Sequence, residues 1–328
     1  MQHYHVYGLG AALVDTEIEV TDQFLESAKI EKGLMTLVDE ARQTELLSLM
    51  KDHLVGSRRS SGGSACNTII AASYFGAKTF YTCKVADDEN GLFFNADTQD
   101  AGVNIPKKEL STGTTGKCLV MITPDAERTM NTFLGISATL DESQLDEEAI
   151  KQSEYVYLEG YLVTSPSGKQ AAIKAREIAE KNNVKTALTL SDPGMVQFFG
   201  DGLKEMLGQK VDLMFCNLDE ALAWTKSENI EQAAESLKLS ANTFAITLGK
   251  DGALVFDGKT LSKVEGEAVK AIDTNGAGDM FAGAFLYAIT NGYSFPEAAK
   301  LANRAAAKVV TQYGPRLKPE QHEALKNA

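Results

Sequence analysis

The sequence predicts an α/β protein with a doubly wound, mainly parallel sheet flanked by helices, and a small separate β-sheet. In the second half of the chain, short apolar runs alternate with helix-like segments, as a parallel sheet with crossover helices requires. Two glycine-rich turns, at 61–64 and 275–278, each lead into a helix of small residues. A stretch rich in Val, Ile and Thr at 114–133 contains Pro124-Asp125, which is typical of a β-hairpin.

The composition is that of a globular protein whose partners are small molecules. The chain has 328 residues, of which 44% are hydrophobic and 23% charged, so a core of ordinary size is available. The net charge of −13 opposes binding to nucleic acid and to anionic membranes. The N-terminus lacks the features of a signal peptide, and no apolar run is long enough to span a membrane. We therefore expect a cytoplasmic protein of one domain, 1–328, either a monomer or a homodimer.

Cysteine and histidine give no sign of a metal site. The cysteines are widely separated, lie in apolar contexts and form no Cys-x-x-Cys pair, so we expect buried free thiols. His3 and His5 have the spacing of a strand, but without a third ligand they are expected at the surface. The cysteines are Cys66, Cys83, Cys118 and Cys216.

The first strand is predicted over 6–14, and it delivers Asp15 to its carboxyl end. Gly8 and Gly10 resemble the start of a dinucleotide fingerprint. Leu13 occupies the place of the third glycine, however, and no helix follows directly, so we reject a dinucleotide site.

Strand and helix patterns continue from there. A half-exposed strand is predicted at 17–20, a helix at 43–54, a strand at 79–85 and a helix at 91–102. The hairpin at 114–133 can join the strand near 16–20 in the small sheet.

In the second half, the predicted strands leave polar residues and glycines at one edge of the main sheet. Ligands bind at the carboxyl ends of parallel strands, so Asp15, Asn217 and Gly249 can converge there. Ser165 and Pro166 mark the start of a helix. The predicted strands are 155–158, 186–190, 213–216, 244–248 and 253–256, and the helices include 170–182 and 296–312.

The stretch 273–286 carries the strongest chemical signal. Unpaired N–H groups at a helix start, together with the helix dipole, can hold a phosphate or a developing anion. Gly276 and Gly278 let such a ligand approach closely. Asp279, in the first helical turn, stands where a general base would take a proton from an attacking hydroxyl. The simpler interpretation is an acid that only complements the helix dipole.

Two strings resemble signatures of the ribokinase-like family of carbohydrate and nucleoside kinases. They are DTNGAGDMFAGAF, whose first part is closest to the adenosine kinase branch, and GGSACNTIIAASYFGA. The resemblance implies a ribokinase-like fold with a lid formed by about 15–37 and 111–137. It also implies that Asp279 is the catalytic base, that the amides of Gly276, Ala277 and Gly278 form an anion hole, and that Asp15, Gly62, Gly63 and Asn67 bind the acceptor hydroxyls.

The same resemblance implies a donor side. Asn217 and Glu220 have the spacing of a helix capping box, and in the family this pair organises Mg²⁺ and its waters. Arg128 on the hairpin is either exposed or able to reach the phosphates. The remaining implied residues are Thr247, Gly249 and Gly252 along ATP, Asn303 near the adenine edge, and Asp273 with Thr274, near Gly314, at a K⁺ site.

We therefore expect an ATP- and Mg²⁺-dependent kinase that phosphorylates the 5′-hydroxyl of a nucleoside, with adenosine to AMP as the nearest case. Ala11 and Ala12 stand where adenosine kinases usually carry Asn-Pro or Asn-Ala. This departure keeps a sugar kinase of the ribokinase or fructokinase type as an alternative. A nucleotide- or sugar-binding regulator without catalysis is the further alternative, and the retained Asp279 argues against it.

Overall fold

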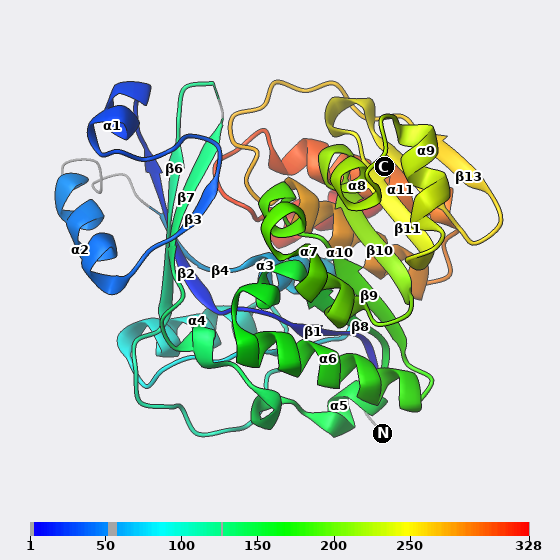
Figure 1. Cartoon of the computed structure of the whole chain (residues 1–328), viewed down its shortest axis with the longest axis horizontal. Coiled ribbons are helices and arrows are strands. Elements are labelled where there is room, and N and C mark those ends of the chain that lie inside the picture. Colours follow the sequence, from blue (N-terminus) through cyan, green and yellow to red (C-terminus); the bar gives the residue numbers. More distant parts are fainter. Residues whose placement is uncertain (1–2, 52–57, 126, 328) are drawn as a thin grey trace.

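The computed structural model describes residues 3–51, 58–125 and 127–327, and it contains the two sheets that the sequence predicts. The main sheet has eight strands in the order β13-β12-β11-β10-β9-β8-β1-β5. The second sheet has five strands in the order β3-β7-β6-β2-β4 and stands beside it (Figure 1). The predicted fold class, a mainly parallel α/β sheet with a small additional β-sheet, is thus confirmed.

Among the described residues, the main sheet is parallel from β5 to β11; β12 runs in the opposite direction and pairs antiparallel with both β11 and the edge strand β13. All of its parallel strands therefore end at the same edge, where ligands bind in folds of this type. Its strands are β1 (Tyr4–Leu9), β5 (Thr79–Thr82), β8 (Ser153–Glu159), β9 (Lys185–Thr189), β10 (Val211–Asn217), β11 (Ala241–Thr247), β12 (Ala253–Phe256) and β13 (Leu261–Val264).

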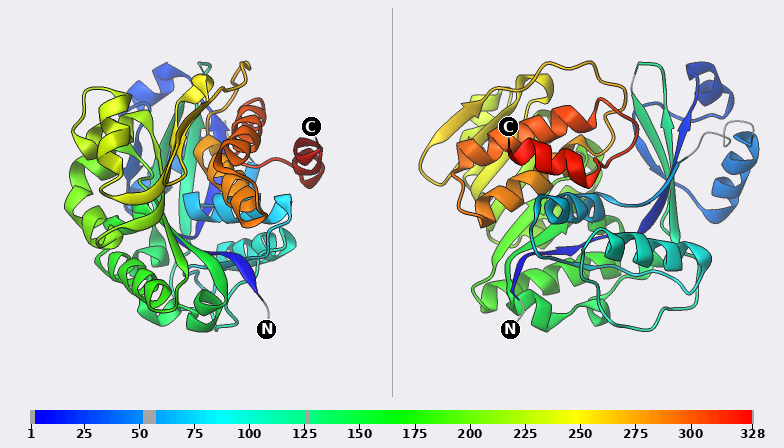
Figure 2. Two further views of the ribbon diagram at one scale, coloured as in Figure 1. Left: turned by 90° about the vertical axis from the view of Figure 1, so that its right-hand side faces the viewer. Right: turned by 180° about the vertical axis from the view of Figure 1, so that it is seen from behind.

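Helices cover both faces of this sheet, each over its own apolar core (Figure 2). Helices α5 to α9 pack on one face: α5 (Glu147–Lys151), α6 (Pro166–Lys181), α7 (Pro193–Leu207), α8 (Leu218–Thr225) and α9 (Ile230–Leu237). On the other face lie α3 (Ser64–Phe75), α4 (Glu89–Asp100), α10 (Ala277–Thr290), α11 (Phe295–Val309) and α12 (Pro319–Lys326). Short 3-10 turns occur at Gly135–Thr139, Glu142–Gln144, Gly160–Thr164 and Gly249–Asp251.

The second sheet has a core of its own. Helices α1 (Asp22–Ser27) and α2 (Glu40–Leu49) cover its outer face, where Ile18, Leu25 and Leu46 are buried. Its inner face is turned toward the carboxyl ends of the main strands (Figure 1). The strands are β2 (Leu13–Glu19), β3 (Met35–Leu37), β4 (Arg58–Gly62), β6 (Gly116–Ile122) and β7 (Arg128–Phe133). The limits of the lid as a moving unit stay a prediction.

Several element bounds differ from the sequence prediction. The strand expected over 6–14 is two strands, because the chain leaves the main sheet after Leu9 and enters the second sheet at Leu13. The helix expected over 43–54 is α2, which begins at Glu40 and ends at Leu49; residues 52–54 lie outside the described residues. The sequence did not indicate α1, β3 or β4.

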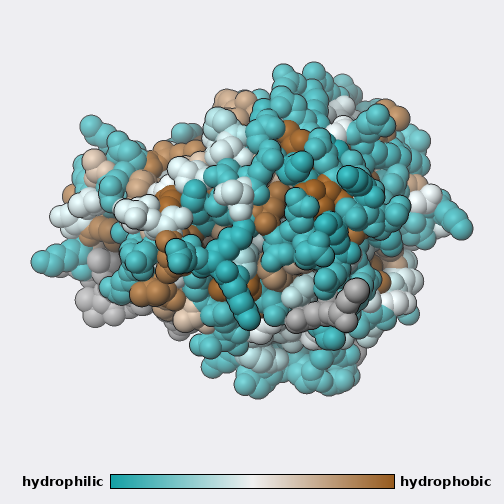
Figure 3. Space-filling model, turned by 90° about the horizontal axis from the view of Figure 1, so that it is seen from below, coloured by the Kyte–Doolittle hydropathy of each residue, from teal (hydrophilic) through white to brown (hydrophobic). Residues whose placement is uncertain are grey.

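The surface fits the acidic, polar composition. The face shown in Figure 3 is largely hydrophilic, with hydrophobic residues in small separate patches. Within the described ranges, each helix is too short or too polar to cross a lipid bilayer. The four cysteines are free; three are buried as expected, whereas Cys83 is partly exposed. His3 is exposed and contacts Glu154, and His5 is partly exposed and accepts a hydrogen bond from the backbone of Lys78.

Candidate active site

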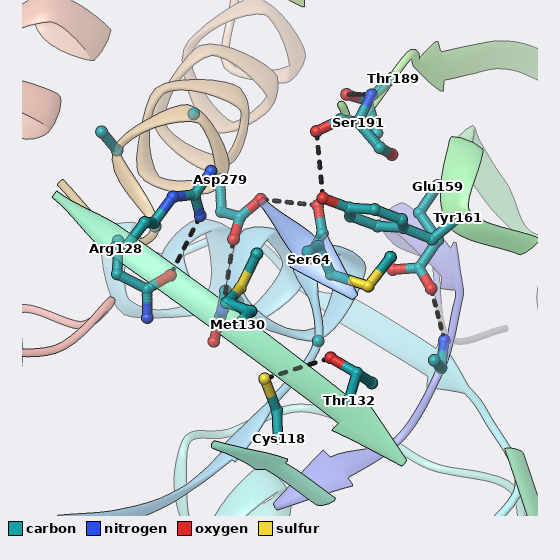
Figure 4. Close-up of a pocket in the computed structure, with 18 of the residues that line it drawn as sticks. Ser64, Cys118, Arg128, Met130, Thr132, Glu159, Tyr161, Thr189, Ser191 and Asp279 are labelled. Atoms are coloured by element: carbon teal, nitrogen blue, oxygen red, sulfur yellow. Dashed lines mark hydrogen bonds between the residues drawn. The ribbon is translucent and has the colours of Figure 1, made fainter. Parts of the chain in front are cut away.

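Two cavities meet at the N-terminus of α10. The larger cavity, of 380 Å³, lies between the carboxyl ends of the main strands and the inner face of the second sheet (Figure 4). The smaller cavity, of 320 Å³, lies between α10, α11 and the loops around β12 and β13. Both are lined by Thr247, Thr274, Ala277, Gly278 and Phe281. A molecule in one cavity can therefore approach a molecule in the other at this helix start.

The start of α10 is open to an anion. Gly276 is its N-cap, has φ +73°, and makes no side-chain cap hydrogen bond. A Cβ atom at Gly276 would lie 2.4 Å from Pro315 Cβ, so a glycine is required. At Gly278 a Cβ would meet nothing within 4 Å, which leaves the backbone accessible. The first N–H groups of a helix lack partners one turn back and carry partial positive charge; at this helix start, Ala277 N makes a long turn bond of 3.3 Å to Thr274 O. The geometry thus suits the predicted anion hole.

Asp279 projects from this first turn toward α3 (Figure 4). Its Oδ1 accepts a hydrogen bond from Ser64 Oγ at 2.7 Å, and its Oδ2 accepts one from Asn67 Nδ2 at 3.2 Å. Burial raises the pKa of Asp279 to about 6, while the bonds from Ser64 and Asn67 and the charge of Arg128 oppose this rise. The carboxyl group is therefore mostly ionised at neutral pH and can accept a proton.

Two residues that line the larger cavity carry buried polar atoms without hydrogen-bond partners among the described residues. Asp15 is 5% exposed, and its Oδ1 has no hydrogen-bond partner among the described residues; Asn67 Oδ1 also lacks one. Burial, with the nearby charge of Glu17, raises the pKa of Asp15 to about 8. A Cβ at Gly62 would lie 2.0 Å from Asp15 Oδ2, so only glycine fits beneath this carboxyl group. Buried polar atoms left unpaired suit a ligand with hydroxyl groups.

Two residues that the sequence analysis missed belong to this site. Glu159, at the end of β8, is 1% exposed and accepts hydrogen bonds from Ala11 N at 2.6 Å and Ala65 N at 2.8 Å. It ties the β1–β2 connection to the start of α3, and its burial raises its pKa to about 7. Ser64 is the other. The available signals were weak: Glu159 directly follows a predicted strand, and Ser64 follows the glycine pair.

The second sheet contributes an arginine and an apolar wall. Arg128 Nη1 donates to Asn275 Oδ1 at 3.2 Å, so it reaches from β7 to the loop before α10. Arg128 thus lines the larger cavity and is partly buried, and its predicted contact with the phosphates stays a prediction. Thr132 Oγ1 donates to Cys118 Sγ at 3.3 Å. The apolar wall consists of Leu13, Met35, Leu37, Cys118, Met130 and Leu134.

Asn217 and Glu220 form the capping box that their spacing predicts, and they line the larger cavity. Glu220 Oε1 accepts from Asn217 Nδ2 at 2.8 Å and Oε2 accepts from Asn217 N at 3.0 Å. Burial raises the pKa of Glu220 to about 7. Each carboxylate oxygen retains acceptor capacity, and Mg²⁺ prefers few protein oxygens plus water, so the pair fits a water-mediated magnesium site.

The smaller cavity brings together the other residues assigned to the donor side. Thr247, Gly249, Gly252 and Asn303 all line it. Asn303 Nδ2 donates to Val264 O at 3.1 Å and to Glu265 O at 3.0 Å. This side chain therefore fixes the loop after β13, and its predicted place at an adenine edge stays a prediction.

Asp273 lies behind the start of α10 and is fully buried. Its Oδ1 accepts from Asn275 N at 2.8 Å and its Oδ2 accepts from Gly314 N at 2.8 Å. These two bonds satisfy the buried carboxylate and link the loop before α10 to the segment around Gly314. The described residues contain no cluster of three or more His, Cys, Asp or Glu that could hold a metal ion. The K⁺ site at Asp273 and Thr274 stays a prediction.

Known proteins are similar to this chain over its whole length. The model of the pfkB family carbohydrate kinases matches residues 42–322. The structure of adenosine kinase from Sinorhizobium meliloti is 35% identical, covers 100% of both chains and has a TM-score of 0.93. That of a probable sugar kinase protein from Rhizobium etli CFN 42 is 33% identical, covers 100% of this chain and 99% of the other, and also has a TM-score of 0.93. Adenosine kinase of Schizophyllum commune is 27% identical over 97% of this chain and 98% of its own.

Proposed function

The chain belongs to the pfkB family of carbohydrate kinases, and from this premise we propose that it transfers the terminal phosphoryl group of ATP to the 5′-hydroxyl of adenosine. As a member of the family it is a phosphotransferase with an alcohol group as acceptor. Kinases of this family use ATP with Mg²⁺. What the proposal adds is the acceptor and the roles of individual residues.

The apolar wall of the larger cavity is the observation that favours a nucleoside over a free sugar. Met35 and Leu37 from β3 face the same space as Met130 from β7. A free sugar carries hydroxyl groups on most of its carbons, and hydroxyls buried against such a wall would lose their hydrogen bonds to water. Burial of the flat faces of a purine against apolar side chains is favourable, because it removes apolar surface from water. Asp15 and Asn67, which line the same cavity, suit the ribose hydroxyls.

The comparisons support the same acceptor. Similar proteins that cover nearly the whole chain are named adenosine kinases, one of them at 35% identity. The similar Rhizobium etli protein is named a probable sugar kinase, and Ala11 and Ala12 depart from the adenosine kinase pattern. A sugar acceptor is therefore the second candidate, and it uses the same catalytic residues.

In the proposed reaction, Asp279 takes the proton of the 5′-hydroxyl as that oxygen bonds to the terminal phosphorus of ATP. The bond from this phosphorus to the bridging oxygen breaks, and ADP leaves with the bonding electrons. The amides at Gly276, Ala277 and Gly278 hold the charge on the transferred group. Most of the acceleration in phosphoryl transfer comes from such positioning and charge stabilisation.

The donor phosphates need more positive charge than the side chains supply. Of the described residues that line the two cavities, only Arg128 and Lys250 are cationic. Magnesium, when bound, neutralises phosphate charge, and Asn217 and Glu220 would hold it through its water ligands. The amides at the start of α10 and the Arg128 guanidinium supply the remaining stabilisation.

The second sheet also has a role in excluding water. Arg128 links it to Asn275 beside the proposed anion hole, and this link supports a sheet that covers the reacting groups during transfer. Water is a competing phosphoryl acceptor, and its exclusion strengthens the electrostatic interactions inside the site.

The test is ADP release with ATP and Mg²⁺, in K⁺ or Na⁺ buffer, against adenosine, inosine, guanosine, cytidine, ribose and fructose. We expect adenosine to have the highest kcat/KM, and the matched control is the Asp279→Asn variant under the same conditions. Turnover of free sugars alone would replace the nucleoside by a carbohydrate acceptor. No turnover of any acceptor would instead support a binding protein. A rate that is equal in K⁺ and Na⁺ would remove the predicted potassium site.

A further inference from the structure

Both oxygens of the Asp279 carboxylate accept hydrogen bonds from side chains of α3. One of these two side chains, that of Ser64, has no part in the reaction proposed above. Ser64 Oγ donates to Oδ1 at 2.7 Å, opposite the bond of 3.2 Å from Asn67 Nδ2 to Oδ2 (Figure 4). Asn67 is already assigned to the acceptor hydroxyls, whereas Ser64 has no assigned role. A carboxylate that accepts on both oxygens is restrained in its orientation, and such donors favour its ionised form.

The backbone fixes Ser64 on both sides. Gly63 before it has φ +98°, and a Cβ there would lie 2.6 Å from Ala11 O, so a larger residue cannot take this turn. Ala65 after it donates its N–H to Glu159 Oε2 at 2.8 Å. The backbone of Ser64 is therefore fixed on one side by Gly63, which packs against the β1–β2 connection, and on the other by the N–H of Ala65, which is bonded to Glu159 at the end of β8.

Close packing also fixes the distance between the two helices. A Cβ at Gly283 of α10 would lie 2.5 Å from Thr68 O and 2.7 Å from Ala71 Cβ of α3. The helices therefore touch through backbone, one turn beyond Asp279. Because both side chains are short and both helices are fixed, the contact between Ser64 and Asp279 follows from the fold.

We propose that Ser64 is a positioning residue that holds the Asp279 carboxylate ionised and aimed to receive the proton of the acceptor. The inference rests on the proposed function, in which Asp279 is the base. Ser64 itself transfers no proton in this scheme, because its hydroxyl hydrogen stays bonded to Asp279 Oδ1 while the acceptor uses the remaining acceptor capacity of the carboxylate.

The charge around Asp279 gives the direction of the effect. Burial raises the pKa of Asp279, and the bond from Ser64 is the first of the interactions that lower it, before Asn67 and Arg128. Loss of the Ser64 hydroxyl therefore raises this pKa further. The other titratable groups near Asp279 are the same in the wild type and in a Ser64 variant. Their effects on the pKa of Asp279 therefore cancel when the two are compared. These groups are Asp15 on β2, Glu159 and Tyr157 on β8, Tyr81 on β5, and Tyr161 after β8.

The experiment is the pH dependence of kcat/KM for the acceptor, measured at saturating ATP for the wild type, Ser64→Ala and Ser64→Thr. We expect the acid limb of Ser64→Ala to move to higher pH. The loss should be roughly tenfold below pH 6 and clearly smaller above pH 8, since a hydrogen bond to a charged group is removed. Ser64→Thr keeps the hydroxyl and should restore the wild-type limb. Ser73→Ala, which removes a bond to Ala101 O on the same helix, is the matched control.

An unchanged acid limb in Ser64→Ala, or an equal loss at every pH, would overturn the inference. ATP affinity, measured by titration calorimetry, should be the same in all variants. An unchanged affinity would show that each variant is folded. Asp279→Asn separates the two proposals. If it is inactive while Ser64→Ala keeps the wild-type profile, only the role of Ser64 fails. If Asp279→Asn is active, the base assignment fails and the inference about Ser64 fails with it.

Discussion

The two cavities that meet at α10 are built in opposite ways. The larger cavity is lined by side chains from both sheets and both ends of the chain, and four of them are carboxyl groups whose pKa burial raises: Asp15, Glu159, Glu220 and Asp279. Among the described residues, those that line the smaller cavity all lie within 247–310, and they include four glycines, four alanines and two valines. The larger cavity is thus rich in buried carboxyl groups, whereas small residues make up much of the lining of the smaller one.

The difference follows from the molecules that each cavity would hold. An acceptor must be held by its hydroxyl groups and must lose a proton, which requires oriented carboxylates in a dry site. A nucleotide donor brings its own charge, so its cavity needs room, apolar surface and backbone N–H groups. Substitutions that remove charge should therefore act on the larger cavity, and substitutions that add volume should act on the smaller one.

The largest expected effect is on the larger cavity. Asp279→Asn removes the proton acceptor but keeps the size of the side chain, so turnover should fall by roughly 10²–10⁴-fold or more. ATP binding should persist, because the smaller cavity does not use this carboxylate. Steady-state ADP release and a calorimetric ATP titration measure the two effects. Turnover close to that of the wild type would show that the charge of Asp279 is not what the larger cavity contributes.

An intermediate effect is expected on the smaller cavity. Gly252 has φ +91°, and a Cβ there would lie 2.1 Å from Val264 O. Gly252→Ala should therefore raise KM for ATP by roughly tenfold, since strain of this kind costs about 1–3 kcal/mol. KM for the acceptor should stay the same. Gly292→Ala is the matched control, because Gly292 also has positive φ, +85°, but an open Cβ position. Equal KM values for ATP in both variants would remove shape as the basis of donor recognition.

The smallest expected effect is on stability. The pKa of Asp15 rises from 3.8 to about 8 on folding, so the folded protein keeps a proton that the unfolded chain releases above pH 4. The contribution of Asp15 to the free energy of unfolding is complete below pH 4 and is lost as the pH rises toward 8. Asp15→Asn cannot titrate. Its Tm relative to the wild type should therefore be higher at pH 8 than at pH 5, by about 2 °C or more.

Calorimetry at both pH values, with no acceptor present, tests this prediction. Asp100→Asn, which changes an exposed carboxyl group on α4, is the matched control. A Tm difference for Asp15→Asn that is the same at pH 5 and pH 8 would show that Asp15 does not keep its proton in the folded protein.

The sequence was most informative where local patterns carry the structure. Strand and helix alternation after residue 153 and the two glycine-rich helix starts were predicted close to their observed positions, because burial and capping have short-range signatures. Of the three residues expected to converge at one edge of the main sheet, Asp15 and Asn217 line the larger cavity, and Gly249 lines the adjoining smaller one. The roles of these residues remain proposals.

Other features depend on partners that lie far away in the chain. β4 has the sequence Arg-Arg-Ser-Ser-Gly, which has no strand pattern of its own, and it is a strand because it pairs with β2. Glu159 shows its role only through the amides of Ala11 and Ala65. For Ser64, the contact with Asp279 joins residues 215 positions apart. Pattern analysis of a single sequence contains no information on such contacts.

The separate core of the second sheet has a consequence for how this protein can diverge. Ile18, Leu25 and Leu46 stabilise that sheet from its outer side, away from the groups of α3 and α10 to which phosphoryl transfer is assigned in the proposal. Residues of the inner wall, such as Met35 and Met130, can therefore be exchanged while both the core beneath them and the reaction chemistry are retained. If the acceptor binds this wall as proposed, a few changes on a single surface would be enough to alter acceptor choice while the residues at the start of α10 stay the same.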